Sequence, residues 1–346
     1  MEQELAAKRI PRQVYDFSGM FSLALRLVVG WTYFSAFWRR LILENKLIED
    51  APGYIGEKFN HFLPNALGIK PIIEYLVSTP DVLWWAMVLF TIIEAIVGLL
   101  FMLGYFTRLA SIGVIGLAGG ILLGSGWIGS TCLDEWQIGV LGVAAGFTVF
   151  MTGGGYYSLD RIWMPKTPWL KTRKWYPWIA SGELSIKESI IKKIVVTGSI
   201  AILALTLFTN QVFHGGVWGE LHNKSVKPKI EISDTGFNNG QLKFTLSRVE
   251  GIDVYGSFLI GITLKDHANN IILELNGDEL ANFPMSDIHN KYVAKVKPGK
   301  YSLIIPLGAK AEINIGKNIN DIPAGTYKLE LTDISGATWE ADITKK

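Results

Sequence analysis

The sequence predicts a membrane-embedded bundle of four α-helices and a fifth transmembrane helix, followed by an antiparallel β-sandwich outside the cytoplasm. Three observations support this fold class. Hydrophobic residues make up 49% of the 346 residues and charged residues only 18%, with the apolar residues in long runs before about residue 215. From Lys229 onward the runs are short and alternate with polar residues. Basic residues gather in the segments between alternate helices.

Five segments are apolar and long enough to cross a bilayer as helices. The third and fourth are short, and glycines recur in them at four-residue spacing, as at Gly116 and Gly120 or at Gly142 and Gly146. Small residues at this spacing predict close packing of the helices. The five segments are approximately Phe17–Trp38, Val82–Leu103, Leu109–Gly124, Glu135–Met151 and Ile194–Phe213.

The C-terminal part has the pattern of an all-β domain. About eight short segments between Lys229 and Ile343 alternate or are continuously apolar, and turn residues such as Asn276-Gly277 separate them. Short antiparallel strands at this density predict an immunoglobulin-like sandwich.

Basic residues also predict the orientation. They precede the first helix, follow the second at Arg108 and are frequent after the fourth, so all fall on one side if five helices alternate. The positive-inside rule makes that side cytoplasmic. We therefore expect a multi-pass plasma-membrane protein with a cytoplasmic N-terminus and an extracytoplasmic C-terminal domain. The lipid bilayer is then a partner and a homo-oligomer is compatible with the sequence, whereas a net charge of +2 argues against nucleic acid.

The segment Ser125–Gln137, between the third and fourth helices, is the first candidate site. It holds the only cysteine, Cys132, which Asp134 and Glu135 follow. A lone cysteine excludes an internal disulfide, a CxxC redox pair and a cysteine-built zinc or iron–sulfur site, so no metal is expected. The two carboxylates could relay protons or cap the fourth helix, and capping is favoured for Asp134.

Two arginines at the outer end of the first helix, Arg39 and Arg40, depart from the charge rule. They could extend to the headgroups of the bilayer. Alternatively, paired guanidinium groups could bind a small oxoanion, because they offer planar, multidentate donors. The Cys132 segment opens on the same predicted face, so the thiol and both arginines could converge.

Arg26 and Glu94 lie inside the first two predicted helices at a similar depth. Charges inside a membrane are costly, so each is expected to have a partner. The two predict an ion pair, either as a structural link between helices or as a proton route for a quinone head group.

Aromatic residues fall near the predicted outer interface, among them Trp31, Trp127 and Trp136, which Gln137 follows. An interfacial aromatic belt and a flat slot for a quinone ring would use the same residues. His214 lies where the fifth helix leaves the membrane, either in a flexible neck or in contact with the Cys132 segment.

Several of these stretches resemble thiosulfate:quinone oxidoreductase. Leu25–Arg40 and Gly129–Gln137 are similar to its DoxD subunit, and Thr209–Gly219 with the β domain is similar to its DoxA subunit. The resemblance implies a fusion, with a DoxD-like four-helix domain over residues 1–190 and a DoxA-like part over residues 191–346. The latter would have its helix at about 194–213 and its sandwich at about 225–346. It also implies oxidation of two thiosulfates to tetrathionate, with a membrane quinone as electron acceptor.

The mechanistic hypothesis uses one thiol. Cys132 thiolate adds to the quinone, thiosulfate attacks the cysteine sulfur and displaces quinol, and a second thiosulfate releases tetrathionate. Two alternatives stay open: a sulfite or thiol:quinone oxidoreductase, and a non-catalytic DoxX-like membrane scaffold. The expected groups are Cys132, Glu135 and Asp134 for catalysis; Arg39, Arg40, Trp127 and His214 for thiosulfate; and Arg26, Glu94, Trp136, Gln137 and Trp31 for quinone.

Overall fold

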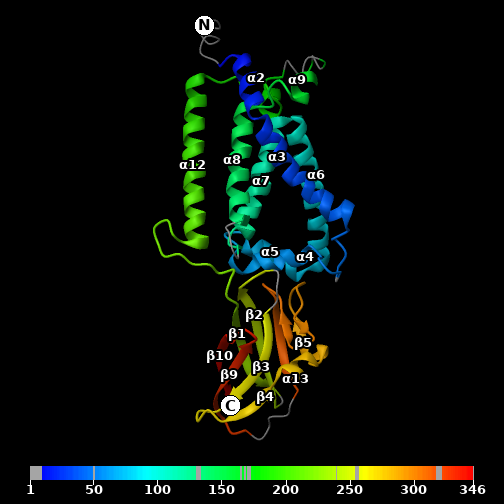
Figure 1. The fold of residues 1–346 in the computed structure, drawn as a ribbon, viewed down its shortest axis with the longest axis vertical. Coiled ribbons are helices and arrows are strands. Elements are labelled where there is room, and N and C mark those ends of the chain that lie inside the picture. The colour runs from blue at the N-terminus through cyan, green and yellow to red at the C-terminus, as the bar shows by residue number, and fades with distance from the viewer. Residues whose placement is uncertain are drawn as a thin grey trace. The chain divides into compact units, whose positions relative to one another are not determined.

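The computed structural model describes residues 10–49, 51–129, 134–163, 166, 169, 173–238, 240–253, 257–316 and 322–345 (Figure 1). The fold class is as predicted, since apolar helices come first and antiparallel sheets follow. The chain forms two compact units. The helical unit comprises Met1–Ile48, Ala86–Gly126 and Asp134–His222, and the β unit comprises Glu49–Trp85, Trp127–Leu133 and Asn223–Lys346. The division into domains at residue 190 stays a prediction.

Long apolar helices dominate the first part of the chain. Three of them are long and apolar enough to cross a membrane, namely α6 (Pro80–Leu103), α7 (Thr107–Ser125) and α12 (Glu188–His214). A fourth candidate is the bent pair of α2 (Arg12–Phe21) and α3 (Leu23–Phe37), which continues as a π-helix, η1 (Trp38–Leu43). The fourth predicted segment forms α8 (Asp134–Thr152), whose polar first turn lowers its mean hydropathy. Two short helices lie between α8 and α12, namely α9 (Leu159–Trp163) and α11 (Tyr176–Ile179).

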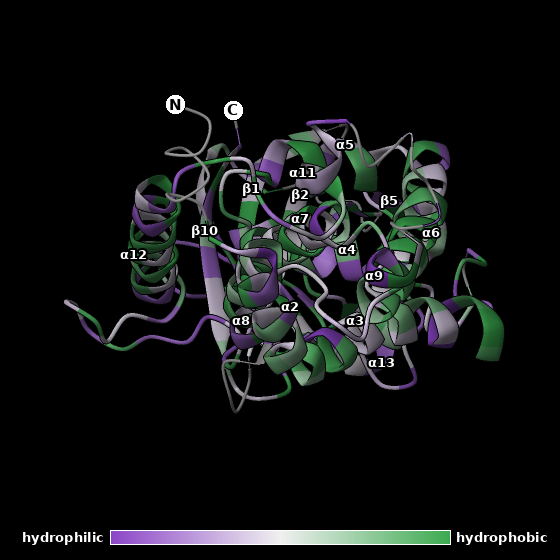
Figure 2. Ribbon diagram, turned by 90° about the horizontal axis from the view of Figure 1, so that it is seen from above, coloured by the Kyte–Doolittle hydropathy of each residue, from purple (hydrophilic) through white to green (hydrophobic). Residues whose placement is uncertain are grey.

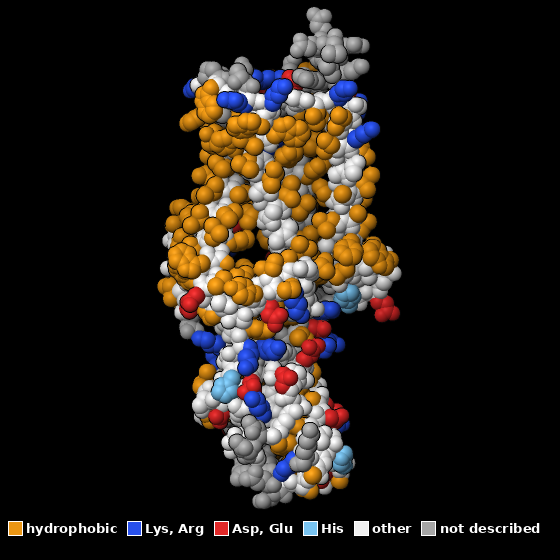
Figure 3. Space-filling model, turned by 180° about the vertical axis from the view of Figure 1, so that it is seen from behind, with side chains coloured by type: hydrophobic (Ala, Val, Ile, Leu, Met, Phe, Trp, Pro, Cys, Tyr) orange, Lys and Arg blue, Asp and Glu red, His pale blue; other side chains and the backbone are white. Residues whose placement is uncertain are grey.

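The helix surfaces fit a lipid environment. Figure 3 shows hydrophobic side chains covering the visible face of the helical unit, with Lys and Arg side chains gathered at one end. Figures 1 and 2 show α12 beside α8 and apart from the other helices. Gly198 of α12 meets the Phe147 ring of α8, but most of the span is exposed.

Glycines decide how closely the helices approach. A Cβ on Gly30 of α3 would lie 2.8 Å from the Gly98 carbonyl oxygen of α6, and a Cβ on Gly98 would lie 2.7 Å from that of Gly30. Gly142 and Gly146 of α8 are packed equally closely against α7, which confirms the prediction for these two glycines. The same prediction is wrong for Gly116 and Gly120, which face open space on α7.

A bend of 57° separates α2 from α3. The Ser22 hydroxyl donates to the Gly19 carbonyl at 3.1 Å, a local bond that competes with the helical ladder and bends helices. Gly19 lies against the backbone of Gly155, which would contact any side chain placed there. The first predicted segment is therefore not one straight helix.

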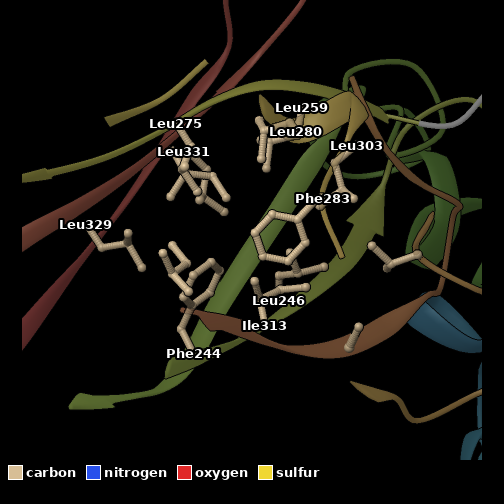
Figure 4. Close-up of a cluster of buried hydrophobic side chains, with 14 of the residues drawn as sticks. Phe244, Leu246, Leu259, Leu275, Leu280, Phe283, Leu303, Ile313, Leu329 and Leu331 are labelled. Atoms are coloured by element: carbon tan, nitrogen blue, oxygen red, sulfur yellow. The ribbon is translucent and has the colours of Figure 1, made fainter. Parts of the chain in front are cut away.

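The β unit contains a sandwich of two antiparallel sheets. One sheet has the strand order β1-β2-β8-β5, and the other has the order β10-β9-β3-β7-β6 with β4 paired to β3. Its core is apolar, and Figure 4 shows Phe244, Phe283 and Leu331 within it. The elements are β1 (Lys229–Asn238), β2 (Gln241–Glu250), β3 (Ser257–Lys265), β4 (Ile271–Leu275), α13 (Gly277–Ala281), η4 (Met285–Asp287), β5 (Ile288–Asn290), β6 (Lys297–Pro298), β7 (Leu303–Ile305), β8 (Lys310–Ile315), β9 (Gly325–Asp333) and β10 (Thr338–Lys345).

Short helices from the N-terminal half belong to the β unit: α4 (Gly56–Phe62), η2 (Leu63–Asn65) and α5 (Lys70–Ser78). Asn60 is fully buried, donates to the Gly308 carbonyl at 3.0 Å and accepts from the Ala294 amide at 3.1 Å. Ile73 and Val77 pack in a cluster with Tyr292 and Val293. Buried hydrogen bonds and apolar contacts thus hold this early segment against the sandwich.

Candidate functional site

A buried ion pair lies inside the helical unit. Nη1 of Arg40 is 2.6 Å from Oε2 of Glu94 on α6, and the same nitrogen donates to the Thr91 hydroxyl at 2.9 Å. The Arg40 and Glu94 side chains are only 13% and 5% exposed. The Thr91 hydroxyl in turn donates a hydrogen bond to the Met87 carbonyl at 2.7 Å. Arg40, which was expected to bind thiosulfate, and Glu94, which was expected to bind quinone, therefore contact each other directly.

Arg40 comes from the π-helix η1, which continues α3. In a π-helix the backbone hydrogen bonds join residues five apart in the chain, whereas in an α-helix they join residues four apart. Such turns are frequent at functional sites. The guanidinium lies 5.9 Å from the centroid of the Phe90 ring. The cluster is therefore a charged, hydrogen-bonded group with an aromatic wall.

The predicted pairing of Arg26 with Glu94 is wrong. Arg26 is 1% exposed and donates to the carbonyls of Gly154, at 2.5 Å, and of Tyr157. Those carbonyls follow the C-terminal end of α8, where backbone acceptors have no helical partner. Equal depth in the sequence did not produce contact because of the bend at Ser22, and Arg26 is bonded to the loop after α8 instead.

Arg39 and Arg40 do not act as a pair. Arg39 is exposed and forms no ion pair or hydrogen bond with the residues that the structure describes, whereas Arg40 is committed to Glu94. Trp31 is 54% exposed and its ring is 6.0 Å from that of Phe34. These positions leave Arg39 available to an external anion and Trp31 on the outer surface of the helix.

A second polar group lies where α7 ends, α8 begins and α12 ends. His214 is buried, and its Nε2 is 2.9 Å from the Gly126 carbonyl oxygen. Because a carbonyl only accepts, Nε2 carries the proton and Nδ1 has the lone pair. Nδ1 is buried without a partner among the described residues.

Trp136 joins the same region, since its indole nitrogen donates to the Thr209 hydroxyl of α12 at 3.0 Å. Glu135 is partly buried and Gln137 is exposed. The beginning of α8 is thus bonded to α12 through Trp136, while Gln137 points away from the protein interior.

Comparison with protein families gives two matches in chain order. The model described as TQO small subunit DoxD matches residues 21–187, and the model described as TQO small subunit DoxA matches residues 213–342. The chain belongs to the DoxD and DoxA families. It joins both in one polypeptide, and at the level of family it is grouped with the thiosulfate:quinone oxidoreductases.

Cys132, in the DoxD part, lies outside the described residues, and Asp134 is described only as the first residue of α8. The chain that leads to Cys132 is well held within the β unit. Trp127 is fully buried and donates to the Phe62 carbonyl at 3.1 Å. This contact makes Trp127 a packing residue of the β unit.

Two residues that follow α12 also hold this chain and were not predicted. The Gly129 amide donates to the Ser225 hydroxyl at 3.0 Å, and the Asn223 side chain donates to the Gly129 carbonyl at 2.7 Å. Thr91, which accepts a hydrogen bond from Arg40, was also not predicted from the sequence. A lone Thr in an apolar helix or an Asn in a linker has no distinctive spacing, so only its contacts identify it. Within the described ranges, no three His, Cys, Asp or Glu side chains are grouped as metal ligands would be.

Proposed function

We propose that the chain oxidises two thiosulfates to tetrathionate and passes the two electrons, with two protons, to a membrane quinone, forming quinol. The observation that carries the proposal is the buried Arg40–Glu94 pair inside an apolar bundle, in a chain that joins the DoxD and DoxA families. Ionised side chains inside a membrane are costly and are expected to have a task. Quinone enters from the lipid, where such a site would meet it.

Glu94 is the proton-carrying group of the quinone side in this proposal. Reduction of a quinone places negative charge on its oxygens, and a nearby carboxyl group can supply a proton. Arg40 holds Glu94 in position at 2.6 Å and stabilises its charge between proton transfers. Arg40 therefore serves the quinone side and does not bind thiosulfate, because its guanidinium is already bonded to Glu94 and Thr91.

Thiosulfate is bound on the extracytoplasmic side, with Arg39 as the exposed guanidinium for this dianion. Cys132 supplies the sulfur chemistry. Its thiolate and one thiosulfate lose two electrons to quinone as the bond between their sulfurs forms. The terminal sulfur of a second thiosulfate then attacks the outer sulfur of this adduct, the cysteine thiolate leaves, and tetrathionate departs.

Three further groups support the sulfur site in this proposal. Glu135 and Asp134 relay protons or cap α8. The Nδ1 lone pair of His214 provides a buried base near the end of α7.

The proposed membrane orientation has the N-terminus in the cytoplasm and the sandwich outside, because Lys187, Lys192 and Lys193 are exposed at the start of α12.

Thiosulfate-dependent reduction of a soluble quinone analogue by the purified protein tests the proposal. Cys132→Ser and Glu94→Gln should each lower turnover at least about a hundredfold while the protein stays folded. Glu188→Gln is the matched control, since Glu188 forms an exposed pair with Lys192, and should keep wild-type turnover.

Three outcomes would contradict the proposal. Turnover with sulfite or a thiol but not with thiosulfate would favour a related oxidoreductase. No quinone reduction with any of these substrates would favour the scaffold. Wild-type turnover in Cys132→Ser would remove the covalent step.

A further inference from the structure

Tyr33 is a buried tyrosine of α3. It is 3% exposed and packs in the main apolar cluster of the helical unit, with Ala118 of α7 and Val143 of α8. Its hydroxyl forms no hydrogen bond with any residue that the structure describes. The hydroxyl of a tyrosine in an apolar core usually has a hydrogen-bond partner, and this phenol can donate to a ligand.

The position of the hydroxyl follows from its neighbours. A Cβ placed on Gly142 of α8 would lie 2.8 Å from the Tyr33 oxygen and 2.7 Å from the Ala118 Cβ. The Tyr33 side chain therefore crosses from α3 to the contact between α7 and α8. The missing side chain at Gly142 leaves room for the phenol oxygen in the bundle interior.

The Arg40–Glu94 pair faces the same interior from another side. Gly30 and Gly98 bring α3 and α6 into backbone contact, one helical turn from Glu94. The two helices run antiparallel, since Arg26 meets Gly104 on one side of this contact and Arg40 meets Glu94 on the other, so Tyr33 and Glu94 both lie about one turn from the contact toward the same end. Two buried polar groups from two contacting helices thus lie toward the same end of the bundle.

This arrangement selects among ligands. A lipid tail has no group for a phenol to donate to, and a free inorganic ion would have to lose its water in an apolar region. A quinone head group is a flat apolar ring with oxygens at opposite ends, which suits an apolar site with few, separated polar groups.

We propose that Tyr33 is the second polar anchor of the quinone head group and donates a hydrogen bond to one carbonyl oxygen, while Glu94 serves the opposite oxygen. The inference rests on the proposed function and deepens it. The phenol keeps its proton in this role. As the quinone oxygen gains negative charge during reduction the hydrogen bond strengthens, so Tyr33 stabilises the reduced form more than the oxidised one.

Tyr33→Phe tests this inference in the full-length protein. The KM for a soluble quinone analogue should rise about tenfold and turnover should fall, because one hydrogen bond to the ligand is lost. The KM for thiosulfate and the melting temperature should stay near wild type. Tyr15→Phe is the matched control. The Tyr15 hydroxyl is also buried without a hydrogen-bond partner among the described residues, but Tyr15 packs in a separate cluster with Leu184 and Ile191, so the change should leave the quinone KM unchanged.

Replacement of Tyr33 by 3-fluorotyrosine keeps the test decisive if Tyr33→Phe folds poorly. The fluorinated phenol is nearly isosteric and a stronger donor, so its quinone KM should be at or below that of wild type. A quinone KM as high as that of Tyr33→Phe would overturn the inference, and so would wild-type quinone KM in Tyr33→Phe.

Equilibrium binding of the oxidised analogue without thiosulfate separates this inference from the proposed function. Binding that weakens in Tyr33→Phe but not in Tyr15→Phe supports Tyr33 even if the wild-type protein shows no thiosulfate-dependent turnover. Wild-type turnover with equal binding in all three proteins would refute the role of Tyr33 and leave the proposed function standing.

Discussion

Removal of one partner of the Arg40–Glu94 pair should be far more damaging than removal of both. The side chains are 13% and 5% exposed, so neither Glu94→Leu nor Arg40→Met leaves the remaining charge in water. Each single change should lower the free energy of unfolding by about 3–5 kcal/mol. The double variant strands no charge, so its loss should be smaller than that of either single variant, and the coupling energy between the two changes should therefore exceed about 3 kcal/mol.

The assay is a double-mutant cycle on the protein in detergent micelles, with the free energy of unfolding measured by denaturant titration. Arg26→Met with Glu94→Leu provides the control cycle, because Arg26 is bonded to the Gly154 and Tyr157 carbonyls instead. Its coupling energy should lie within about 0.5 kcal/mol of zero. A coupling that small for Arg40 and Glu94, or a larger one for Arg26 and Glu94, would refute the pairing.

Further predictions concern orientation, pH and the β unit. Protease added to intact cells should remove the sandwich and spare the loop between α8 and α12; the reverse would invert the proposed orientation. Burial, and secondarily the Lys58 charge, lowers the pKa of His61 to about 4. As the pH falls, His61 is therefore protonated in the unfolded state before it is protonated in the folded state. The free energy of unfolding should therefore fall by up to about 3 kcal/mol as pH drops from about 6.5 to 4. His61→Gln should flatten this slope, and an unchanged slope would exclude His61. Gly308→Ala should cost more than about 3 kcal/mol, because its φ is +74° and its Cβ would lie 1.8 Å from the Asn60 carbonyl oxygen. Gly336→Ala, at φ +83° with no neighbour within 4 Å, should cost only about 1–2 kcal/mol, and equal losses would contradict the clash.

The positions of the candidate site residues were harder to predict than their chemical types. The sequence suggested that Glu94 has a charged partner, and it does, but the partner is Arg40 rather than Arg26. It suggested that Arg39 and Arg40 act together, yet one is exposed and the other is bonded inside the bundle. Helical depth counted along the chain assumes straight α-helices, and the bend at Ser22 and the π-helix Trp38–Leu43 break that assumption.

By itself, the sequence determined the two-part architecture and the family. Hydropathy and the two-residue alternation of strands are local properties of the chain, and bilayer thickness converts apolar length directly into transmembrane helices. Only the tertiary structure decided which glycines lie at helix contacts, that α4 and α5 belong with the sandwich, and that Tyr33 lies opposite Gly142. These facts depend on crossing angles, bends and contacts between residues far apart in the chain, which no local pattern records.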